Sequence, residues 1–210
     1  MRKYVLKINN SKFVIRNLNA GMTYVELIVV LSIFVIMSSV VIYNYGDFQD
    51  KVDIKNLSSD IALKVVEAQK SAVSGLLPSI GTLPNWKPAY GVYFNTNSSS
   101  NTSFIYFTDI DQNGSFTNPP TCLSGGECVQ QFTITKGAKI SALNVFYSGD
   151  TNAHALTELN LVFTRPNSGP KIQSTPAISG TVNYVQVTVQ SAKLFNVNIK
   201  IYPSGRIQVN

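Results

Sequence analysis

The sequence predicts an α+β protein in which one long N-terminal helix precedes an antiparallel, β-rich head domain. Residues 27–43 form an uncharged apolar run, and apolar residues then recur at steps of three or four up to residue 74. Beyond residue 90 the apolar spacing changes to two, which is typical of half-buried strands. A chain of 210 residues with 44% hydrophobic content has room for one globular domain and an N-terminal extension.

Positive charge is concentrated at the start of the chain. The formal net charge is +6, from 17 basic and 11 acidic residues. Without the first 21 residues, 12 basic residues face 11 acidic ones, so charge alone does not indicate a nucleic-acid-binding protein. The five basic residues of this leader are Arg2, Lys3, Lys7, Lys12 and Arg16.

The small-residue pair Ala20-Gly21 precedes the apolar run instead of following it. An ordinary secretory signal is cleaved after its apolar segment, but Asn44 to Phe48 lacks a small-x-small pattern. Cleavage between Gly21 and Met22 would remove residues 1–21 as a basic leader and keep the apolar helix. We therefore expect a processed chain that begins at Met22.

Residues 22–43 are predicted to form a membrane helix with one carboxylate at its edge. Leu27 to Tyr43 carries no charge and would span roughly 26 Å as a helix, near the lower limit for crossing a bilayer. A carboxylate in such a position is costly unless paired, which makes Glu26 a functional candidate. A new α-amine on Met22 would lie about one turn away and could neutralise it.

An amphipathic helix is expected over residues 44–74, continuous with the first, because no proline interrupts the pattern. Gly46 is the expected flexible point, and Ser74-Gly75 the expected end. The apolar positions of this segment are Phe48, Val52, Leu57, Ile61, Val65, Ala68 and Ala72.

The stretch Gly21-Met22-Thr23-Tyr24-Val25-Glu26-Leu27, with the apolar run behind it, resembles the N-terminus of type IV prepilins and type II secretion pseudopilins. Met22 stands where phenylalanine is commoner, and the leader of 21 residues is long. The helix-then-strands layout is similar to minor pseudopilins of the GspH/FimT type. The C-terminal Ile201 to Arg206 resembles their strand-turn-strand ending.

This resemblance implies a filament subunit without enzymatic activity. A prepilin peptidase would cut after Gly21 and methylate Met22, and Glu26 would guide assembly. The implied partners are other pilin or pseudopilin subunits and an inner-membrane assembly platform. The implied location is the bacterial inner membrane, crossed once with the head outside the cytoplasm, and then the pilus or pseudopilus.

A linker is predicted over residues 75–89, and the head over residues 90–210. Its strands are expected to form an antiparallel two-sheet packing with the polar half of the long helix laid against one side. A hairpin is expected across Ser191-Ala192-Lys193. The candidate strands are Tyr90 to Phe94, Ser103 to Phe107, Gln131 to Thr135, Lys139 to Tyr147, Leu156 to Phe163, Val185 to Val189, Phe195 to Ile201 and Arg206 to Val209.

Cys122 and Cys128 are the only cysteines, and two glycines lie between them. This arrangement predicts a small disulfide loop, which persists only in an oxidising compartment; free thiols are the alternative. Two thiolates with a single distant histidine, His154, do not complete a zinc site.

No cofactor is expected, but Asp109, Asp111, Asn113 and Gly114 follow half of a calcium-loop pattern. The position of the bidentate glutamate is Pro120, which excludes a full EF-hand. A hairpin turn explains the same residues, and calcium remains the alternative. His154 is the only histidine and no G-x-S-x-G motif occurs, so nucleophilic catalysis has no support.

DNA binding, as in minor pilins that serve natural transformation, is the alternative function. There a C-terminal Gly-Arg-x-Arg makes the contact. Here the matching stretch is Gly205-Arg206-Ile207-Gln208, with glutamine in place of the second arginine. Arg206 is therefore the one candidate DNA contact.

Overall fold

A computed structural model describes residues 22–78, 86–117, 122 and 126–210. The chain divides into two compact units, Met1–Asn44 and Tyr45–Asn210. One helix, α1 (Tyr24–Ser74), contributes residues to both units, and ten strands belong to the second unit. The protein is therefore α+β, as the sequence predicts.

Helix α1 has a defined cap at each end. The Thr23 hydroxyl accepts a hydrogen bond from the Glu26 amide at 3.2 Å, which satisfies one of the unpaired donors of the first turn. At the other end the Leu76 amide donates to the Ser71 carbonyl and the Gly75 amide donates to Ala72, with Gly75 at a φ of 73°. This is a Schellman motif, and it ends the helix at the residue that the sequence predicts.

The first half of α1 is apolar and exposed. Its most apolar stretch of 18 residues has a mean hydropathy of 2.8, and no part of that stretch is buried. Within the described residues this is the one helix long and apolar enough to cross a membrane.

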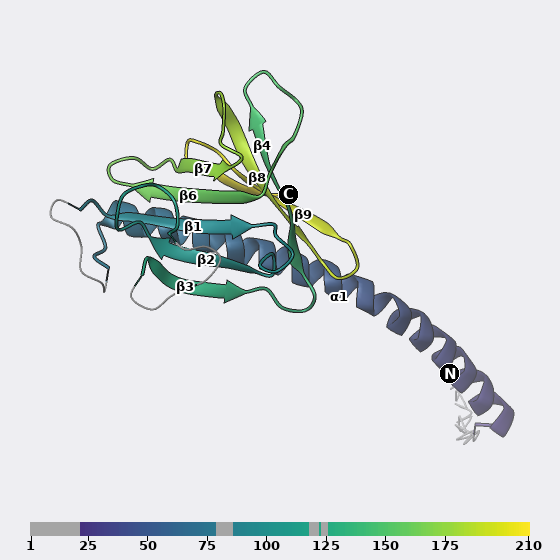
Figure 1. Ribbon diagram of the computed structural model, residues 1–210. Helices are drawn as coiled ribbons and strands as arrows, with labels where there is room; N and C mark the ends of the chain where they lie inside the picture. The colour runs from purple at the N-terminus through teal and green to yellow at the C-terminus, as the bar shows by residue number, and fades with distance from the viewer. Residues whose placement is uncertain (1–21, 79–85, 118–121, 123–125) are drawn as a thin grey trace, which may run out of the picture. The chain divides into compact units, whose positions relative to one another are not determined.

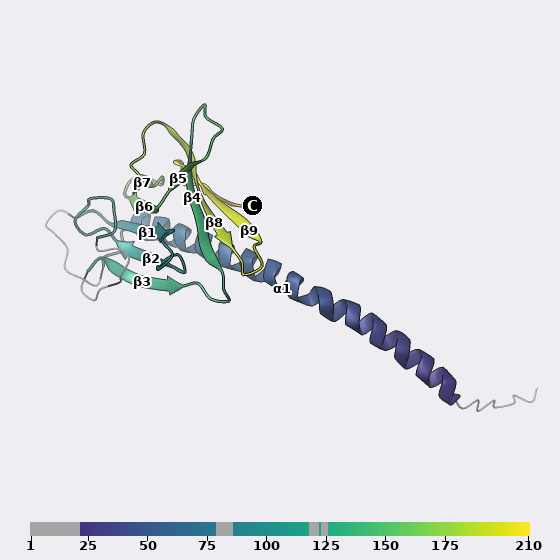
Figure 2. The same ribbon diagram turned by 45° about the vertical axis from the view of Figure 1, so that its right-hand side comes forward.

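The second unit contains two five-stranded antiparallel sheets (Figures 1 and 2). The first has the order β3-β2-β1-β6-β7 and the second the order β10-β9-β8-β4-β5. The strands of the first are β1 (Ala89–Asn95), β2 (Ser103–Thr108), β3 (Cys128–Thr133), β6 (Glu158–Thr164) and β7 (Lys171–Thr175). Those of the second are β4 (Lys139–Tyr147), β5 (His154–Leu156), β8 (Val182–Gln190), β9 (Asn196–Ile201) and β10 (Ile207–Val209).

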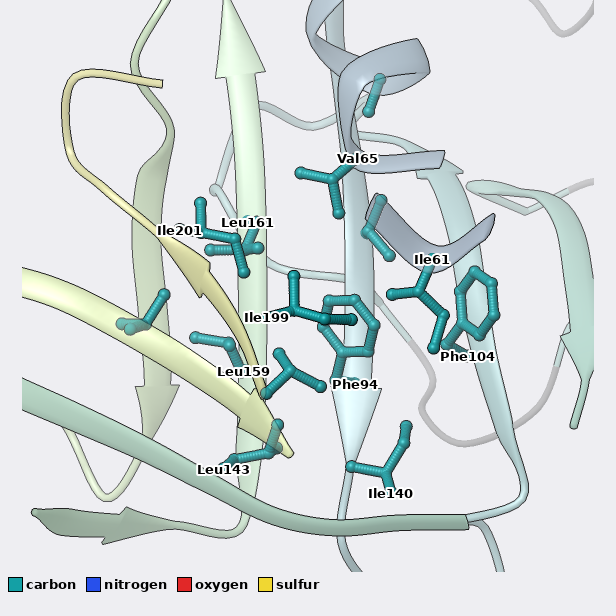
Figure 3. Close-up of a cluster of buried hydrophobic side chains, with 14 of the residues drawn as sticks. Ile61, Val65, Phe94, Phe104, Ile140, Leu143, Leu159, Leu161, Ile199 and Ile201 are labelled. Atoms are coloured by element: carbon teal, nitrogen blue, oxygen red, sulfur yellow. The ribbon is translucent and has the colours of Figure 1, made fainter. Parts of the chain in front are cut away.

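A single apolar cluster contains side chains from both sheets and from α1 (Figure 3). Alternate residues of β1, β2, β6, β8 and β9 enter it, as the period of two requires. From the helix, Ile61 and Val65 are fully buried, whereas Phe48 is 63% exposed although its spacing placed it on the apolar face. The largest buried members are Phe94, Phe163, Ile61, Ile140, Leu143, Leu159, Leu161, Ile199 and Ile201.

The first sheet is also buried on its other face. Tyr93, Ile105, Phe107 and Val162 point away from the main cluster and pack with Phe116, which lies in the β2–β3 connection. Every residue of β1 is buried as a result. This second cluster fixes the β2–β3 connection against the sheet, and the acidic residues described below lie in that connection.

The strands depart from the sequence prediction in several places, and β8 begins at Val182, three residues before its predicted start. Leu156 to Phe163 is divided into β5 and β6, which belong to different sheets. Strand β3 begins at Cys128, three residues earlier than predicted, because it pairs with the end of β2. Strand β7 was not predicted, since Lys171–Thr175 is polar and only partly buried at a sheet edge. The predicted β8–β9 hairpin is confirmed.

Candidate functional site

The predicted processing junction lies at the edge of the described residues. Gly21 is outside them, so only the Met22 side of the predicted cleavage is described. Met22 is 65% exposed and precedes the first turn of α1. Glu26 is exposed in that first turn, one helical turn from Met22.

Glu26 also fits a local role that the sequence analysis missed. Thr23-x-x-Glu26 matches a capping box, in which a threonine and a glutamate satisfy each other's free backbone amides. The structure contains the threonine half of that motif, the bond from the Glu26 amide to Thr23. A carboxylate at a helix N-terminus is also favoured by the helix dipole. Any test of Glu26 must therefore separate its charge from helix capping.

Three carboxylates meet where β2 ends and β3 begins. Asp109 directly follows β2, Asp111 lies two residues later, and Glu127 directly precedes β3. One oxygen atom from each lies within 4.8 Å of the others. The antiparallel β2–β3 pairing brings Glu127 to this position, with its carbonyl accepting a hydrogen bond from the Thr108 amide at 2.8 Å.

Backbone amides hold all three carboxylates in place, and Asp111 accepts its bond from the Asn113 amide at 3.1 Å. The Glu127 side chain accepts hydrogen bonds from the amides of Ile110 at 3.0 Å and Thr117 at 2.8 Å. One oxygen of Asp109, Oδ2, accepts a bond from the Gly114 amide at 2.9 Å. The Asp109 backbone is bonded in turn to Trp86, whose indole donates to its carbonyl at 2.9 Å.

The predicted turn is present, but Asn113 does not join the carboxylate cluster. Its side-chain oxygen accepts bonds from the backbone and hydroxyl of Ser115, and its amide nitrogen donates to Asp111 at 2.7 Å. Glu127 takes part instead. The sequence signal that could have found it is its place next to Cys128, across a hairpin from Asp109.

Asp109 is the most deeply buried acid of the cluster. It is only 2% exposed, and Glu127 is 7% exposed, whereas Asp111 is exposed. Burial, followed by contact with the Asp111 carboxyl, raises the pKa of Asp109 to about 6. The Gly114 amide opposes this shift without cancelling it.

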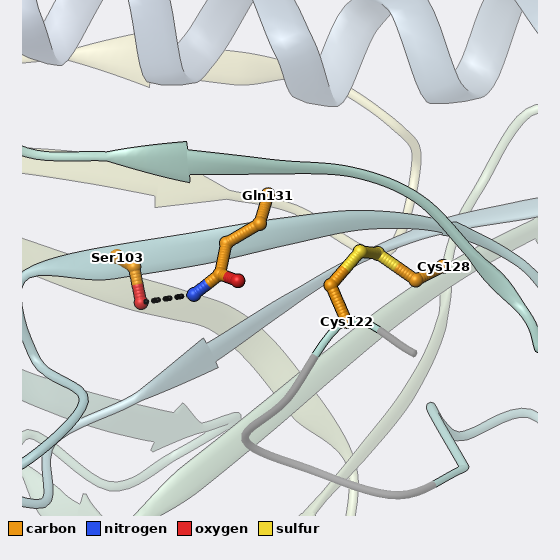
Figure 4. Close-up of a disulfide and its surroundings, with 4 residues drawn as sticks. All are labelled: Ser103, Cys122, Cys128 and Gln131. Atoms are coloured by element: carbon orange, nitrogen blue, oxygen red, sulfur yellow. Dashed lines mark hydrogen bonds between the residues drawn. A yellow bond between two sulfur atoms is a disulfide. The ribbon is translucent and has the colours of Figure 1, made fainter. Parts of the chain in front are cut away.

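Cys122 and Cys128 form a disulfide, which confirms the pairing predicted from their spacing (Figure 4). Their Cα atoms are 5.2 Å apart, within the usual range for a disulfide. Cys128 is the first residue of β3 and the neighbour of Glu127. The bridge therefore closes the β2–β3 connection beside the acidic cluster.

Arg206 is exposed in the turn between β9 and β10, and its guanidinium lies 3.9 Å from the centre of the Tyr202 ring. Tyr202 contacts Tyr184, over which the Lys200 ammonium lies. Gln208, which occupies the place of a second arginine, accepts a hydrogen bond from the Tyr202 hydroxyl at 3.4 Å. The two cations thus stack on the protein's own tyrosines.

The only histidine, His154, lies on the surface of β5. Its Nε2 is 2.8 Å from Asp150, and its ring meets the edge of Tyr147. The Asn152 amide, followed by His154, lowers the pKa of Asp150. This pair lies in β5 and the β4–β5 connection of the second sheet, and the acidic cluster lies at the first.

Comparison with known proteins gives no match: no family model, no curated protein and no solved structure is significantly similar to this chain.

Proposed function

We propose that this protein is a minor pilin or pseudopilin, an inner-membrane precursor that is cleaved after Gly21 and then joins a helical filament. The observation that carries the proposal is the order of Gly21, Glu26 and a long uncharged helix in the sequence. Glycine, carboxylate and apolar run must coincide at fixed spacing, which makes the pattern specific. A membrane-anchored enzyme is not favoured, since the sequence offers no nucleophile with a neighbouring base.

We further infer that α1 serves in two environments. Residues 22–43 would lie in the bilayer and later in the filament core, where exposed apolar side chains such as Phe34 and Ile36 would gain neighbours. Residues 44–74 would lie against the head. Supporting this division, Ile61 and Val65 are buried within the second unit, and none of the described residues before Tyr45 belongs to its apolar clusters.

Two features favour a head outside the cytoplasm. A disulfide persists in oxidising compartments and is rare in the cytosol. The basic residues before Gly21 favour a cytoplasmic N-terminus under the positive-inside rule. If the chain crosses the membrane once between this N-terminus and the head, the head lies on the side away from the cytoplasm, where filament subunits assemble.

In the assembled filament, Glu26 would pair with the Met22 amine of its own chain or of a neighbouring subunit. This pairing would select one register between neighbouring subunits. An unpaired carboxylate in an apolar core is heavily penalised, so registers that leave Glu26 unpaired are disfavoured. Prepilin peptidase, other subunits and the membrane assembly platform are the partners that this mechanism requires.

Cleavage is tested by Gly21→Ala in cells that produce a prepilin peptidase. We expect the variant to accumulate as the uncleaved precursor on an immunoblot, about 2 kDa larger than the processed chain. Gly46→Ala is the matched control, because it makes the same substitution within the helix. Normal processing of Gly21→Ala would refute the assigned site, and processing must remain normal in Gly46→Ala.

DNA uptake is the second candidate function. It is supported by Arg206 and Lys200, which lie over the rings of Tyr202 and Tyr184. Aromatic and cationic side chains together suit single-stranded nucleic acid. An affinity for DNA that falls steeply with salt and is lost in Arg206→Ala would favour it. Binding unaffected by Arg206→Ala would exclude this face.

A further inference from the structure

The cluster at the end of β2 holds a buried carboxylate oxygen without a hydrogen bond. Asp109 is 2% exposed, and within the described residues its Oδ1 atom has no hydrogen-bond partner. Leaving a buried polar atom unsatisfied costs free energy, and such an atom in a folded protein calls for an explanation. Because Oδ2 already accepts the Gly114 amide, Oδ1 is the atom left over.

The same place gathers negative charge without a counter-charge. Across the described part of the chain, none of the ion pairs involves Asp109, Asp111 or Glu127. The nearby Lys171 donates to the Asn113 carbonyl and not to a carboxylate. Three close carboxylates repel one another, and two of them are shielded from water. Either a bound cation or a proton shared between two carboxylates must offset this repulsion.

Geometry and donor type fit a cation. A calcium ion binds six to eight oxygen atoms at about 2.3–2.6 Å, so two of its ligands lie at most about 5 Å apart. The three carboxylate oxygens lie within 4.8 Å of one another and meet this limit. We propose that Asp109, Asp111 and Glu127 bind one divalent cation of the calcium class.

The donor set argues against other metals. Zinc prefers nitrogen and sulfur ligands, but both cysteines are joined in a disulfide, and His154 is paired with Asp150 in the other sheet. Magnesium requires near-ideal octahedral geometry and keeps several waters. Two buried carboxylates fixed by backbone amides, with the exposed Asp111 on the open side, suit the looser calcium shell.

Bound calcium would fasten the two ends of the β2–β3 connection. Asp109 and Asp111 belong to the end that leaves β2, and Glu127 belongs to the end that enters β3 beside the disulfide. The ion would therefore stabilise the head by binding the folded chain and not the unfolded one. This inference does not depend on the proposed filament role.

Trp86 gives a direct probe, because it is the only tryptophan and its indole donates to the Asp109 carbonyl at 2.9 Å. The full-length chain in detergent is stripped with EDTA, desalted and titrated with Tb³⁺, a luminescent calcium substitute. Exciting Trp86 should produce sensitised terbium emission. Calcium should abolish that emission at concentrations at least about tenfold lower than magnesium requires.

Calcium alone is tested by thermal unfolding of the same protein. At a tenfold excess over the dissociation constant, the midpoint should rise by roughly 4 °C. Asp109→Asn, Asp111→Asn and Glu127→Gln should each weaken calcium binding at least about tenfold. In Asp109→Asn the calcium-free protein should unfold at a higher temperature than the unsubstituted chain, since a buried charge is removed while a side-chain oxygen remains for Gly114.

Asp150→Asn is the matched control for Asp111→Asn. Both aspartates accept a bond from the amide two residues later, at 2.8 Å for Asp150 and 3.1 Å for Asp111. Asp150→Asn must leave the calcium response unchanged. If calcium neither displaces terbium nor raises the midpoint, a proton shared by Asp109 and Asp111 compensates the cluster and the proposal fails. It fails equally if Asp111→Asn and Asp150→Asn respond alike.

Discussion

Single residues with two simultaneous roles decide how this protein can be tested. The Glu26 amide bonds to Thr23 in the helix cap, and the Glu26 carboxylate is the proposed assembly charge. Asp109 satisfies the Gly114 amide with one oxygen and leaves the other unpaired. Asp109→Ala would remove both roles of that side chain. Glu26→Ala would remove the carboxylate but keep the backbone bond to Thr23, and an amide variant of either residue removes only the charge.

Glu26→Gln is expected to abolish filament incorporation as fully as Glu26→Ala, because only a carboxylate can pair with a cationic amine. Glutamine is also a capping-box residue, so it keeps helix capping. Incorporation is measured as the protein in sheared or cross-linked filaments, with Gly21 cleavage checked on the same blot.

The control for this prediction is Thr23→Ala, which removes the observed cap at a cost of about 1 kcal/mol and leaves the charge. We expect it to assemble. Assembly of Glu26→Gln, together with failure of Thr23→Ala, would assign Glu26 to helix capping and overturn the register mechanism.

At the scale of elements, α1 is one helix whose two parts have different surroundings. Every residue from Leu27 to Tyr43 is exposed except Ser38, which is half-buried. Ile61, Val65 and Ala68, in contrast, are fully buried among strands of both sheets. Helix propensity cannot produce this difference, because both parts are helical. The helix–sheet packing of the second unit produces it.

Ile61→Ala should lower the free energy of unfolding by about 3 kcal/mol, since the side chain is fully buried and its removal leaves a cavity. Urea unfolding of the purified chain, followed by Trp86 fluorescence, measures this loss. Leu63→Ala is the matched control, because Leu63 lies in the same helix and is 62% exposed. Its effect should stay within about 0.5 kcal/mol. Equal losses in both variants would contradict the packing described for α1.

At the scale of the whole molecule, the second unit contains every member of both apolar clusters found among the described residues. The first of these residues in the chain is Ile54. A fragment that begins at Tyr45 therefore keeps the complete core, whereas one that begins after α1 loses the helical part of it.

A fragment of residues 45–210 should be soluble without detergent, form the Cys122–Cys128 disulfide and unfold cooperatively. Circular dichroism during heating and a thiol assay measure these properties. A fragment of residues 75–210 is the control and should aggregate, because both sheets would expose the surface that Ile61 and Val65 cover. Non-cooperative unfolding of the longer fragment would show that its folding requires residues before Tyr45.

The sequence by itself determined the α+β class, the extent of α1, most strands and the disulfide pair. These features depend on local periodicity, on caps and turns, and on cysteines close in sequence, all of which can be read from neighbouring residues. The apolar run and the position of Glu26 belong here too, and they carry the proposed function.

Only the tertiary structure decided which segments meet. It separated β5 from β6 and paired the polar strand β7 at a sheet edge, where little burial is needed and periodicity is weak. It also showed that the third member of the cluster with Asp109 and Asp111 is Glu127 and not Asn113. Fifteen residues lie between Asp111 and Glu127 in the chain, and only antiparallel pairing of β2 with β3 brings their charges together. Local sequence patterns do not predict that pairing, because its free energy comes from contacts between segments that are distant in the chain.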